Sequence, residues 1–192
     1  KILKKKLIGN LISIKSKFGI NILKKKNFLG KEILKKQDFS NRLFNEDLGG
    51  GVILDLGCYP TSFCILVASL YFDLDIDKIK VKTNSKQFGN TGVEIDSSAS
   101  ISFNNIINAE VETSFIRNIG SESEIIGDKG KLIIKDTWQG SSSISLILDN
   151  KNKEIFNEAK NNCYYYQSKN TSNNILNKKS TPDQPIKEND TT

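Results

Sequence analysis

The sequence predicts an α+β fold: a large, mostly antiparallel, open-faced sheet with one long helix packed on one face. Residues 52–72 form the most apolar segment of the chain and have the spacing of a buried helix. Residues from about 77 to 157 contain at least four segments in which apolar and polar residues alternate, which is the pattern of half-buried strands. A helix on the apolar face of such a sheet gives the two layers of an α+β fold.

The N-terminal region predicts a helix end, a strand and a long loop. Residues 1–7 place apolar side chains among lysines, as the end of a helix does, and Gly9 then permits a turn. Residues 11–20 alternate as a half-buried strand does, and Ile12, Ile14 and Phe18 form the apolar side. Residues 21–47 are irregular and polar, so we expect a loop of a length that often carries function.

Three consecutive glycines, residues 49–51, precede the predicted helix. Its apolar face is expected to consist of Ile53, Leu56, Phe63, Val67 and Leu70. Pro60 lies inside the helix and removes one backbone hydrogen bond, so a kink is expected between Leu56 and Pro60.

The second half of the chain predicts an antiparallel meander with one apolar and one polar face. Its strands are predicted at residues 79–81, 99–103, 107–115, 132–134 and 144–148. Asn104-Asn105 and residues 127–130 are expected to form hairpin turns. After residue 161 the chain is polar; residues 164–167 are expected to open a helix, and the end of the chain, with Pro182 and Pro185, to be a loop.

Charge is unevenly distributed along the chain. Residues 1–36 contain twelve lysines and a single acid, Glu32, within a net charge of +6. Such a stretch can bind phosphate backbones or anionic lipid, but nucleic-acid binders usually add Arg and aromatic residues, and this stretch has no Arg and only Phe18 and Phe28. A genome rich in Lys, Asn and Ile codons accounts for it more simply. We therefore expect no nucleic-acid partner.

The composition also bounds the cellular context. The three cysteines have no zinc-ligand spacing and there is no His, so no metal site is expected and a reducing, cytoplasmic compartment fits best. Cys58 and Cys64 lie in an apolar run, where a free Cys behaves as a small hydrophobe. No apolar run of membrane-spanning length is evident, so no membrane span is expected. The chain has no Met, which favours an internal or truncated piece over removal of an initiating Met.

Asp55 and Tyr59 are the candidate catalytic residues. They lie four residues apart in an otherwise apolar helix, and this spacing places them on one face. A buried carboxylate requires a hydrogen-bond partner, and the tyrosine hydroxyl one turn away is a candidate. A tyrosine has an ordinary pKa of about 10, so proton transfer near neutral pH requires a nearby cation. In the alternative, Asp55 caps local backbone and Tyr59 is a core residue. From the residues alone the two interpretations are equally supported.

The segment GGGVILDLGCYP, residues 49–60, resembles the G-G-G-x-L-x-D-x-G-x-Y segment of the Gfo/Idh/MocA oxidoreductases, which include glucose–fructose oxidoreductase, inositol dehydrogenase and dihydrodiol dehydrogenase. Other segments fit the family in order along the chain, and together they cover most of residues 1–170: residues 8–19, 41–51, 125–138 and 164–167. The glycine segment is fairly specific, whereas the others are informative by their order.

The resemblance implies a domain organisation and a cofactor. Residues 1–7 would end an interdomain helix, residues 8–160 would form the substrate and dimerisation domain, and residues 161–192 a partial helix and polar tail. NAD or NADP would be bound by a dinucleotide domain that this sequence lacks, since no G-x-G-x-x-G is present. This piece alone is therefore not expected to be active.

The resemblance also implies roles for individual residues. Tyr59 matches the proton donor or acceptor at the substrate oxygen, and Asp55 an acidic residue of the substrate site. Arg42 matches, more weakly, a substrate-site arginine, and Gly50 and Gly51 would lie against substrate. The family's catalytic Lys, the cation that Tyr59 requires, would belong to the absent domain. The implied reaction is hydride transfer between nicotinamide and the CH–OH group of a sugar, polyol or diol.

Two alternatives belong to other functional classes. One is a non-catalytic homologue or scaffold that uses its sheet face for association, since fold alone does not determine function. The other is a basic nucleic-acid-binding domain, which the missing Arg and aromatic residues disfavour. The family further implies a homodimer or higher oligomer formed through the polar sheet face. The residues predicted on this face are Ser100, Ser102, Glu110, Glu112 and Ser114.

Overall fold

The computed structural model describes residues 2–138, 140–149, 151–156 and 163–177. The chain divides into two compact units, Lys1–Phe156 and Asn157–Thr192. In the second unit the helix α2 spans Cys163–Leu176, which confirms the helix predicted to open at residues 164–167. The predicted C-terminal loop lies outside the described residues.

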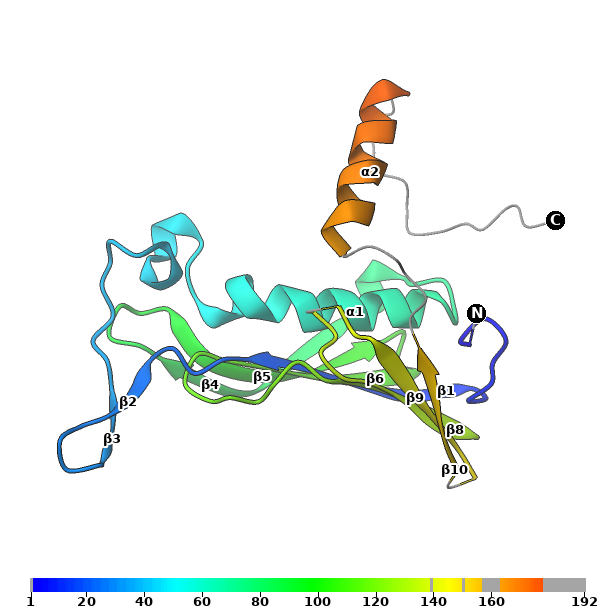
Figure 1. The fold of residues 1–192 in the computed structure, drawn as a ribbon, viewed down its shortest axis with the longest axis horizontal. Helices are drawn as coiled ribbons and strands as arrows, with labels where there is room; N and C mark the ends of the chain where they lie inside the picture. Colours follow the sequence, from blue (N-terminus) through cyan, green and yellow to red (C-terminus); the bar gives the residue numbers. More distant parts are fainter. Residues whose placement is uncertain (1, 139, 150, 157–162, 178–192) are drawn as a thin grey trace. The chain divides into compact units, whose positions relative to one another are not determined.

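The first unit is built on an eight-stranded sheet with strand order β10-β9-β8-β7-β1-β6-β5-β4 (Figure 1). The strands are β1 Leu11–Gly19, β4 Lys80–Phe88, β5 Glu94–Phe103, β6 Ile107–Ser114, β7 Ser123–Gly127, β8 Gly130–Ile134, β9 Ser143–Leu148 and β10 Lys151–Phe156. All neighbouring strands are antiparallel except β1 and β6, which are parallel. The predicted α+β class and mostly antiparallel sheet are confirmed.

Strand β1 joins the two halves of the sheet, because β6 lies on one side of it and β7 on the other. Its predicted core face was wrong at one position. Ile14 and Phe18 are buried as expected, but Ile12 is exposed and Leu11 is buried. The pairing of β1 with β7 shifts register between Leu11 and Ser13, and such a bulge reverses the side chains that follow it.

The turns at both hairpins form where they were predicted. Asn104 and Asn105 have φ of 52° and 57°, a left-handed backbone that Asn tolerates better than most residues. The Ile106 N–H donates to the Phe103 carbonyl at 2.9 Å, which closes the turn between β5 and β6. The second turn joins β7 to β8, with Gly127 paired to Gly130.

The helix begins at Val52, next to Gly51 as predicted, and its first turns are not α-helical. Residues Ile53–Gly57 form a π-helical segment, η3, and α1 continues from Cys58 to Ser69. Pro60 follows the π segment directly within one continuous helical run, so the wider turn lies just before the residue whose backbone N–H is missing. The buried residues of this helix are Val52, Leu56, Gly57, Pro60, Cys64, Val67 and Ala68. Leu70, predicted on this face, is exposed.

Helix α1 packs on one face of the sheet (Figure 1). The core divides into two clusters, one around Ile14, Cys64 and Phe103, the other around Phe18, Val52 and Phe115. The helical stretch Glu46–Ser69 is long and apolar enough to cross a membrane by length and composition, which the sequence analysis did not anticipate. However, 44% of its most apolar part is buried inside this fold, as in the core helix of a soluble domain.

The region expected to be an irregular loop contains short elements. Strands β2 (Lys24–Lys26) and β3 (Glu32–Leu34) form a separate two-stranded hairpin. Two 3-10 helices follow, η1 (Arg42–Phe44) and η2 (Glu46–Leu48); a third, η4 (Ile76–Lys78), precedes β4. Residues 1–7 were expected to end a helix, but the structure shows consecutive turns over residues 2–8. Short, polar elements of this kind leave little periodicity in a sequence, which is why the hairpin was missed.

Candidate functional site

The site begins at the three glycines, which fold the Arg42 segment against the start of the helix. Gly49 ends η2 with a left-handed φ of 69°. A Cβ on Gly50 would lie 2.6 Å from the Asn45 carbonyl oxygen and 2.7 Å from that of Arg42. Gly51 has a φ of 106°, which a side chain rarely adopts. Gly50 and Gly51 are both buried: Gly50 lies against the backbone of Arg42 and Asn45, and Gly51 lies against Val93 and Glu94.

Arg42 and Asp55, two of the predicted site residues, are brought together by this fold. The Arg42 Nη2 donates to the Asp55 Oδ1 at 2.6 Å. The Arg42 side chain is 56% exposed, whereas the Asp55 side chain is 22% exposed. Asp55 lies in the π-helical segment at the start of the helix, and the ion pair with Arg42 forms there. The Tyr59 hydroxyl was the candidate hydrogen-bond partner of Asp55. Within the described part of the chain, the Asp55 carboxylate bonds instead to Arg42, and no hydrogen bond joins it to Tyr59.

Tyr59 lies one turn further along, with 47% of its surface exposed. The Phe18 ring meets its ring edge-on at a centroid distance of 5.6 Å, and Trp138 lies at 5.8 Å. These contacts hold the ring, while the hydroxyl makes no hydrogen bond to another residue that the structure describes. Tyr59 is thus neither a fully buried core residue nor a freely rotating surface side chain.

Trp138 is the residue that the sequence reasoning missed. It follows β8, far from Tyr59 in the sequence, and its indole Nε1–H donates to the Lys17 carbonyl at 3.3 Å. It also meets Phe63 edge-on at 5.8 Å. It is the only Trp in the chain, and a lone Trp at the end of a hairpin was the available signal.

A second ion pair borders the start of the helix. The Glu94 Oε2 lies 3.0 Å from where a Cβ on Gly51 would be, and the Lys86 Nζ lies 2.9 Å from the other Glu94 oxygen. Burial acts to raise the pKa of Glu94, but the hydrogen bond and charge of Lys86 outweigh it and hold the pKa below its ordinary value. The carboxylate is therefore charged near neutral pH.

The two cysteines of the helix have different environments. Cys64 is buried, and burial raises the pKa of its thiol to about 12, so it acts as a small core residue as expected. Cys58 is exposed, contrary to the expectation of a hydrophobic position, because it lies on the outer side of the first α1 turn. Within the described ranges, no group of three or more His, Cys, Asp or Glu side chains could hold a metal ion.

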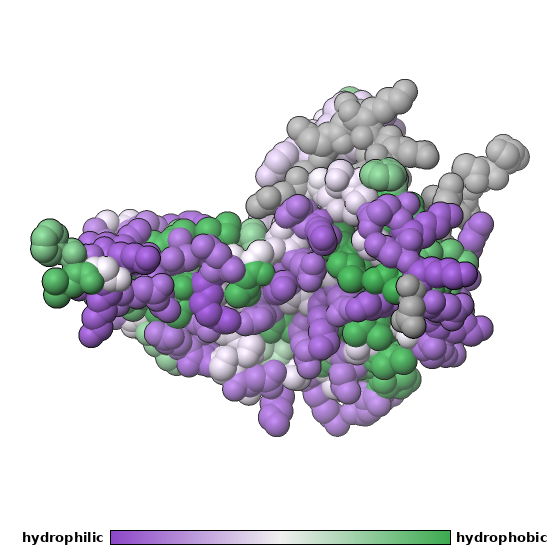
Figure 2. All heavy atoms as spheres, turned by 60° about the horizontal axis from the view of Figure 1, so that its bottom comes forward, coloured by the Kyte–Doolittle hydropathy of each residue, from purple (hydrophilic) through white to green (hydrophobic). Residues whose placement is uncertain are grey.

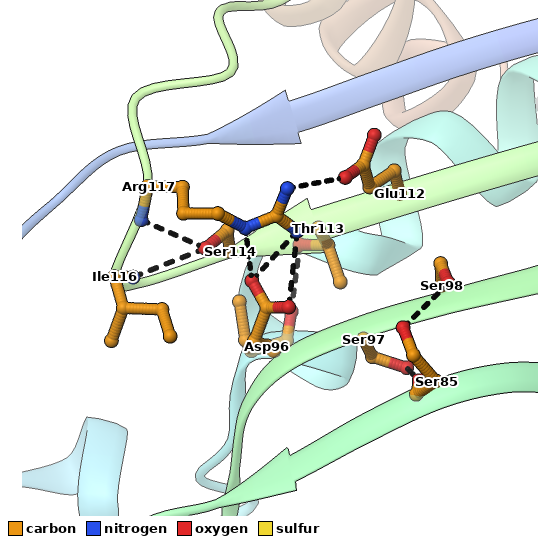
Figure 3. A network of polar contacts seen from close by, with 10 residues as sticks. Ser85, Asp96, Ser97, Ser98, Glu112, Thr113, Ser114, Ile116 and Arg117 are labelled. Atoms are coloured by element: carbon orange, nitrogen blue, oxygen red, sulfur yellow. Dashed lines mark hydrogen bonds and ion pairs between the residues drawn. The ribbon is translucent and has the colours of Figure 1, made fainter.

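The sheet face opposite α1 is polar, as predicted, and several of its charges are paired. Figure 3 shows Arg117 between two carboxylates: its Nε lies 2.9 Å from the Asp96 Oδ1 and its Nη1 lies 2.7 Å from the Glu112 Oε1. Ser114, predicted for this exposed face, is fully buried. Its hydroxyl accepts hydrogen bonds from the N–H groups of Ile116 and Arg117, so it closes the turn after β6 instead.

Comparison with known proteins gives consistent matches. The family model described as the GFO/IDH/MocA C-terminal domain matches residues 1–133. A trans-1,2-dihydrobenzene-1,2-diol dehydrogenase of Xenopus tropicalis is 25% identical over 155 residues, which cover 80% of this chain and 40% of that protein.

Solved structures with the same fold include two oxidoreductases. An aldose–aldose oxidoreductase from Caulobacter crescentus, complexed with glycerol, matches with a TM-score of 0.69 and 17% identity, covering 92% of this chain and 49% of its own. A 3-ketoreductase from Actinomadura kijaniata, in complex with NADP and TDP-benzene, matches with a TM-score of 0.71 and 15% identity. The match covers 93% of this chain and 50% of the ketoreductase chain. The chain thus spans about half the length of these relatives.

Proposed function

The chain belongs to the GFO/IDH/MocA family as its C-terminal domain, and from this premise we propose that it binds substrate and mediates dimerisation in an NAD(P)-dependent oxidoreductase. The substrate is a sugar, polyol or diol that reacts at a CH–OH group. The observation that carries the proposal is the Tyr59 hydroxyl: its ring is held by Phe18 and Trp138, yet the hydroxyl is left without a partner in the described chain.

Tyr59 moves the proton. A hydroxyl that makes no internal hydrogen bond can bond to a substrate oxygen and can give or take the proton as that oxygen becomes a hydroxyl or a carbonyl. The two aromatic contacts limit the rotation of the ring, and this fixes the direction from which the hydroxyl meets substrate.

Arg42 and Asp55 orient the substrate. An ion pair as exposed as this one contributes roughly 0–1 kcal/mol to stability, so the fold does not depend on it. The Asp55 carboxylate accepts hydrogen bonds from hydroxyl groups, and the Arg42 guanidinium donates hydrogen bonds to hydroxyl oxygens. Adjacent hydroxyls of a polyol present both kinds of partner, and the pair therefore suits a substrate with neighbouring CH–OH groups.

The dinucleotide, when bound, accepts or supplies the hydride. The glycines before the helix do not fit its pyrophosphate, because the backbone of Arg42 and Asn45 lies against Gly50 and the carboxylate of Glu94 lies beside Gly51. The phosphates would be held by a separate dinucleotide-binding domain, as in the two-domain arrangement implied by the resemblance. Cys58 and Cys64 are free thiols, and a reducing cytoplasmic compartment suits them.

The test of the proposal is turnover by the complete enzyme, with the dinucleotide-binding domain present. Steady-state activity is measured with NAD and NADP against a panel of sugars, inositols and diols. We expect at least one substrate of this class to be oxidised, or its ketone reduced. An enzyme that binds dinucleotide but turns over none of the panel would contradict the proposed function and favour the scaffold alternative.

We further propose that the polar sheet face pairs two copies of the chain. The exposed or half-exposed side chains that would meet there are Ser100, Ser102, Glu110 and Glu112. Lys15 lies 3.4 Å from Glu110 on this face, so charges of both signs are interspersed and the face can be self-complementary across a two-fold axis. Light scattering of the full-length enzyme at micromolar concentration is expected to give the molar mass of a dimer. A monomer at that concentration would contradict this pairing.

A further inference from the structure

Arg42 is carried by a short segment, residues 39–50, that folds back on the start of the helix. The Arg42 side chain is 56% exposed, so neighbouring side chains do little to fix it. A long side chain that must be ordered when substrate binds weakens binding, because its conformational freedom is lost at that moment. The position of the guanidinium therefore depends on how firmly the backbone of this segment is held.

Asn45 holds the segment through both ends of its side-chain amide. The Asn45 Oδ1 accepts a hydrogen bond from the Asp47 N–H at 3.0 Å, and the Asn45 Nδ2 donates to the Phe39 carbonyl at 3.0 Å. The first bond caps η2, and the second reaches back along the chain past Arg42. The two bonds thus enclose the part of the segment that carries the arginine.

The backbone of Asn45 continues the connection to Asp55. The Asn45 N–H donates to the Arg42 carbonyl at 3.3 Å, and the Asn45 carbonyl accepts from the Gly50 N–H at 2.8 Å. One residue further on, the Gly51 carbonyl accepts from the Asp55 N–H at 3.1 Å. The 2.6 Å hydrogen bond from the Arg42 guanidinium to the Asp55 carboxylate closes the circuit. The geometry of the ion pair is therefore linked to Asn45 by a continuous path of bonded groups.

The chemistry of the amide explains why an asparagine stands at this position. Asn45 has a φ of −118° and a ψ of 116°, an extended backbone that other residues adopt equally well. Asp could accept the hydrogen bond that caps η2 but offers no donor to the Phe39 carbonyl, and Ser has a single polar atom for two partners. An amide carries its acceptor and its donor on separate atoms, as these two partners require.

The segment is also attached to the core independently of this amide. Phe44 is buried and meets the Phe115 ring edge-on at a centroid distance of 6.1 Å. The Gly51 N–H donates to the Leu43 carbonyl at 2.9 Å. These contacts remain when the Asn45 amide is removed. A variant at this position should therefore fold and lose order only within the segment.

We propose that Asn45 is a positioning residue for the substrate site. Its amide fixes the backbone that carries Arg42, so the Arg42–Asp55 pair is ordered before the adjacent hydroxyls of a substrate reach it. The inference rests on the proposed function of this pair and adds the residue that orients it. Because the ring of Tyr59 is held by other elements, Asn45 affects substrate binding and leaves the proton transfer unchanged.

Hydrogen exchange of the complete enzyme tests the order of the segment without any turnover. In Asn45→Ala, the amides of Asp47 and Gly50 are expected to exchange faster than in the parent. Asn45→Ser keeps an acceptor for the Asp47 N–H and should restore at least part of its protection. Circular dichroism establishes that each variant is folded. Unchanged exchange in folded Asn45→Ala would overturn the positioning role.

Steady-state kinetics tests the effect on substrate. The KM of Asn45→Ala is expected to rise roughly two- to tenfold with kcat unchanged, as when an interaction made equally in the ground and transition states is lost. Adding Asn45→Ala to Arg42→Ala should raise KM no further, because Asn45 acts through Arg42. A fall in kcat, or effects on KM that add in the double variant, would overturn the proposal.

Asn27→Ala is the matched control. The Asn27 Oδ1 accepts hydrogen bonds from the N–H groups of Leu29 at 3.0 Å and Lys31 at 2.9 Å, so this substitution also removes an amide that closes a turn. The turn joins β2 to β3, and Leu29 within it is exposed. Figure 2 shows hydrophobic atoms at the left extremity, where Figure 1 places this hairpin, away from the start of the helix. Asn27→Ala should leave KM unchanged.

The two measurements separate this inference from the proposed function. A parent enzyme that turns over no substrate would contradict the proposed function, whereas hydrogen exchange would still decide whether Asn45 orders the segment. A segment that loosens in Asn45→Ala while the KM of an active enzyme stays at the parent value would overturn the positioning role alone.

Discussion

Replacing Tyr59 by Phe in the complete enzyme is expected to lower turnover by roughly 10² to 10⁴, the range for loss of a positioned general acid–base group. The substitution removes only the hydroxyl. The edge-on contact with Phe18 and the contact with Trp138 involve the ring, which Phe retains. Dinucleotide affinity should hardly change, since the pyrophosphate would be held by the other domain.

Tyr71→Phe is the matched control for this experiment. Tyr71 is partly buried in the other core cluster, and its hydroxyl is buried without a hydrogen-bond partner in the described chain. Removing that hydroxyl should leave turnover unchanged and should not reduce the free energy of unfolding. Steady-state kinetics and cofactor titration are measured for both variants. Unchanged turnover in Tyr59→Phe would mean that Tyr59 is only a packing residue.

The sequence predicted most of the sheet because burial of one face imposes an alternation that is visible in the residues. Strands β5 and β6 and their Asn104-Asn105 turn follow this rule. The rule failed at Ile12, where a single-residue bulge changes which side chains face the core. A bulge leaves no compositional trace, so the alternation alone could not locate it.

The helix prediction shows a second limit. A helix beginning near Gly51 was predicted correctly, but its π-helical start was not. In a π turn the hydrogen bonds run from residue i to i+5, so the four-residue spacing of Asp55 and Tyr59 no longer guarantees neighbouring side chains. Asp55 instead pairs with Arg42. The chain turns back at the glycines between these two residues, and the turn brings Arg42 to the start of the helix. Contacts between distant segments, including that of Trp138 with Tyr59, depend on packing that no local pattern encodes.

Replacing Gly50 by Ala is expected to lower the free energy of unfolding by about 1–3 kcal/mol, the usual cost of overpacking. Three backbone atoms of Arg42 and Asn45 lie at 2.6–2.7 Å from the new Cβ, closer than any real Cβ contact, and backbone cannot move aside as a flexible side chain can. The Arg42 segment must shift, and its 2.6 Å hydrogen bond to Asp55 is then lengthened or lost. Chemical denaturation measures the stability change.

Gly49→Asn separates this steric effect from the loss of a glycine. Gly49 has a left-handed φ of 69° and nothing within 4 Å of a Cβ, and Asn tolerates that backbone better than most residues. The Gly49→Asn substitution should therefore lower the free energy of unfolding less than Gly50→Ala does, and it should leave the Arg42–Asp55 pair in place. In the complete enzyme, Gly50→Ala should raise the substrate KM and Gly49→Asn should not, because the role assigned to Gly50 is to position Arg42. If Gly50→Ala retained full stability but raised KM, Gly50 would instead contact substrate directly, and the packing account of this glycine would be wrong.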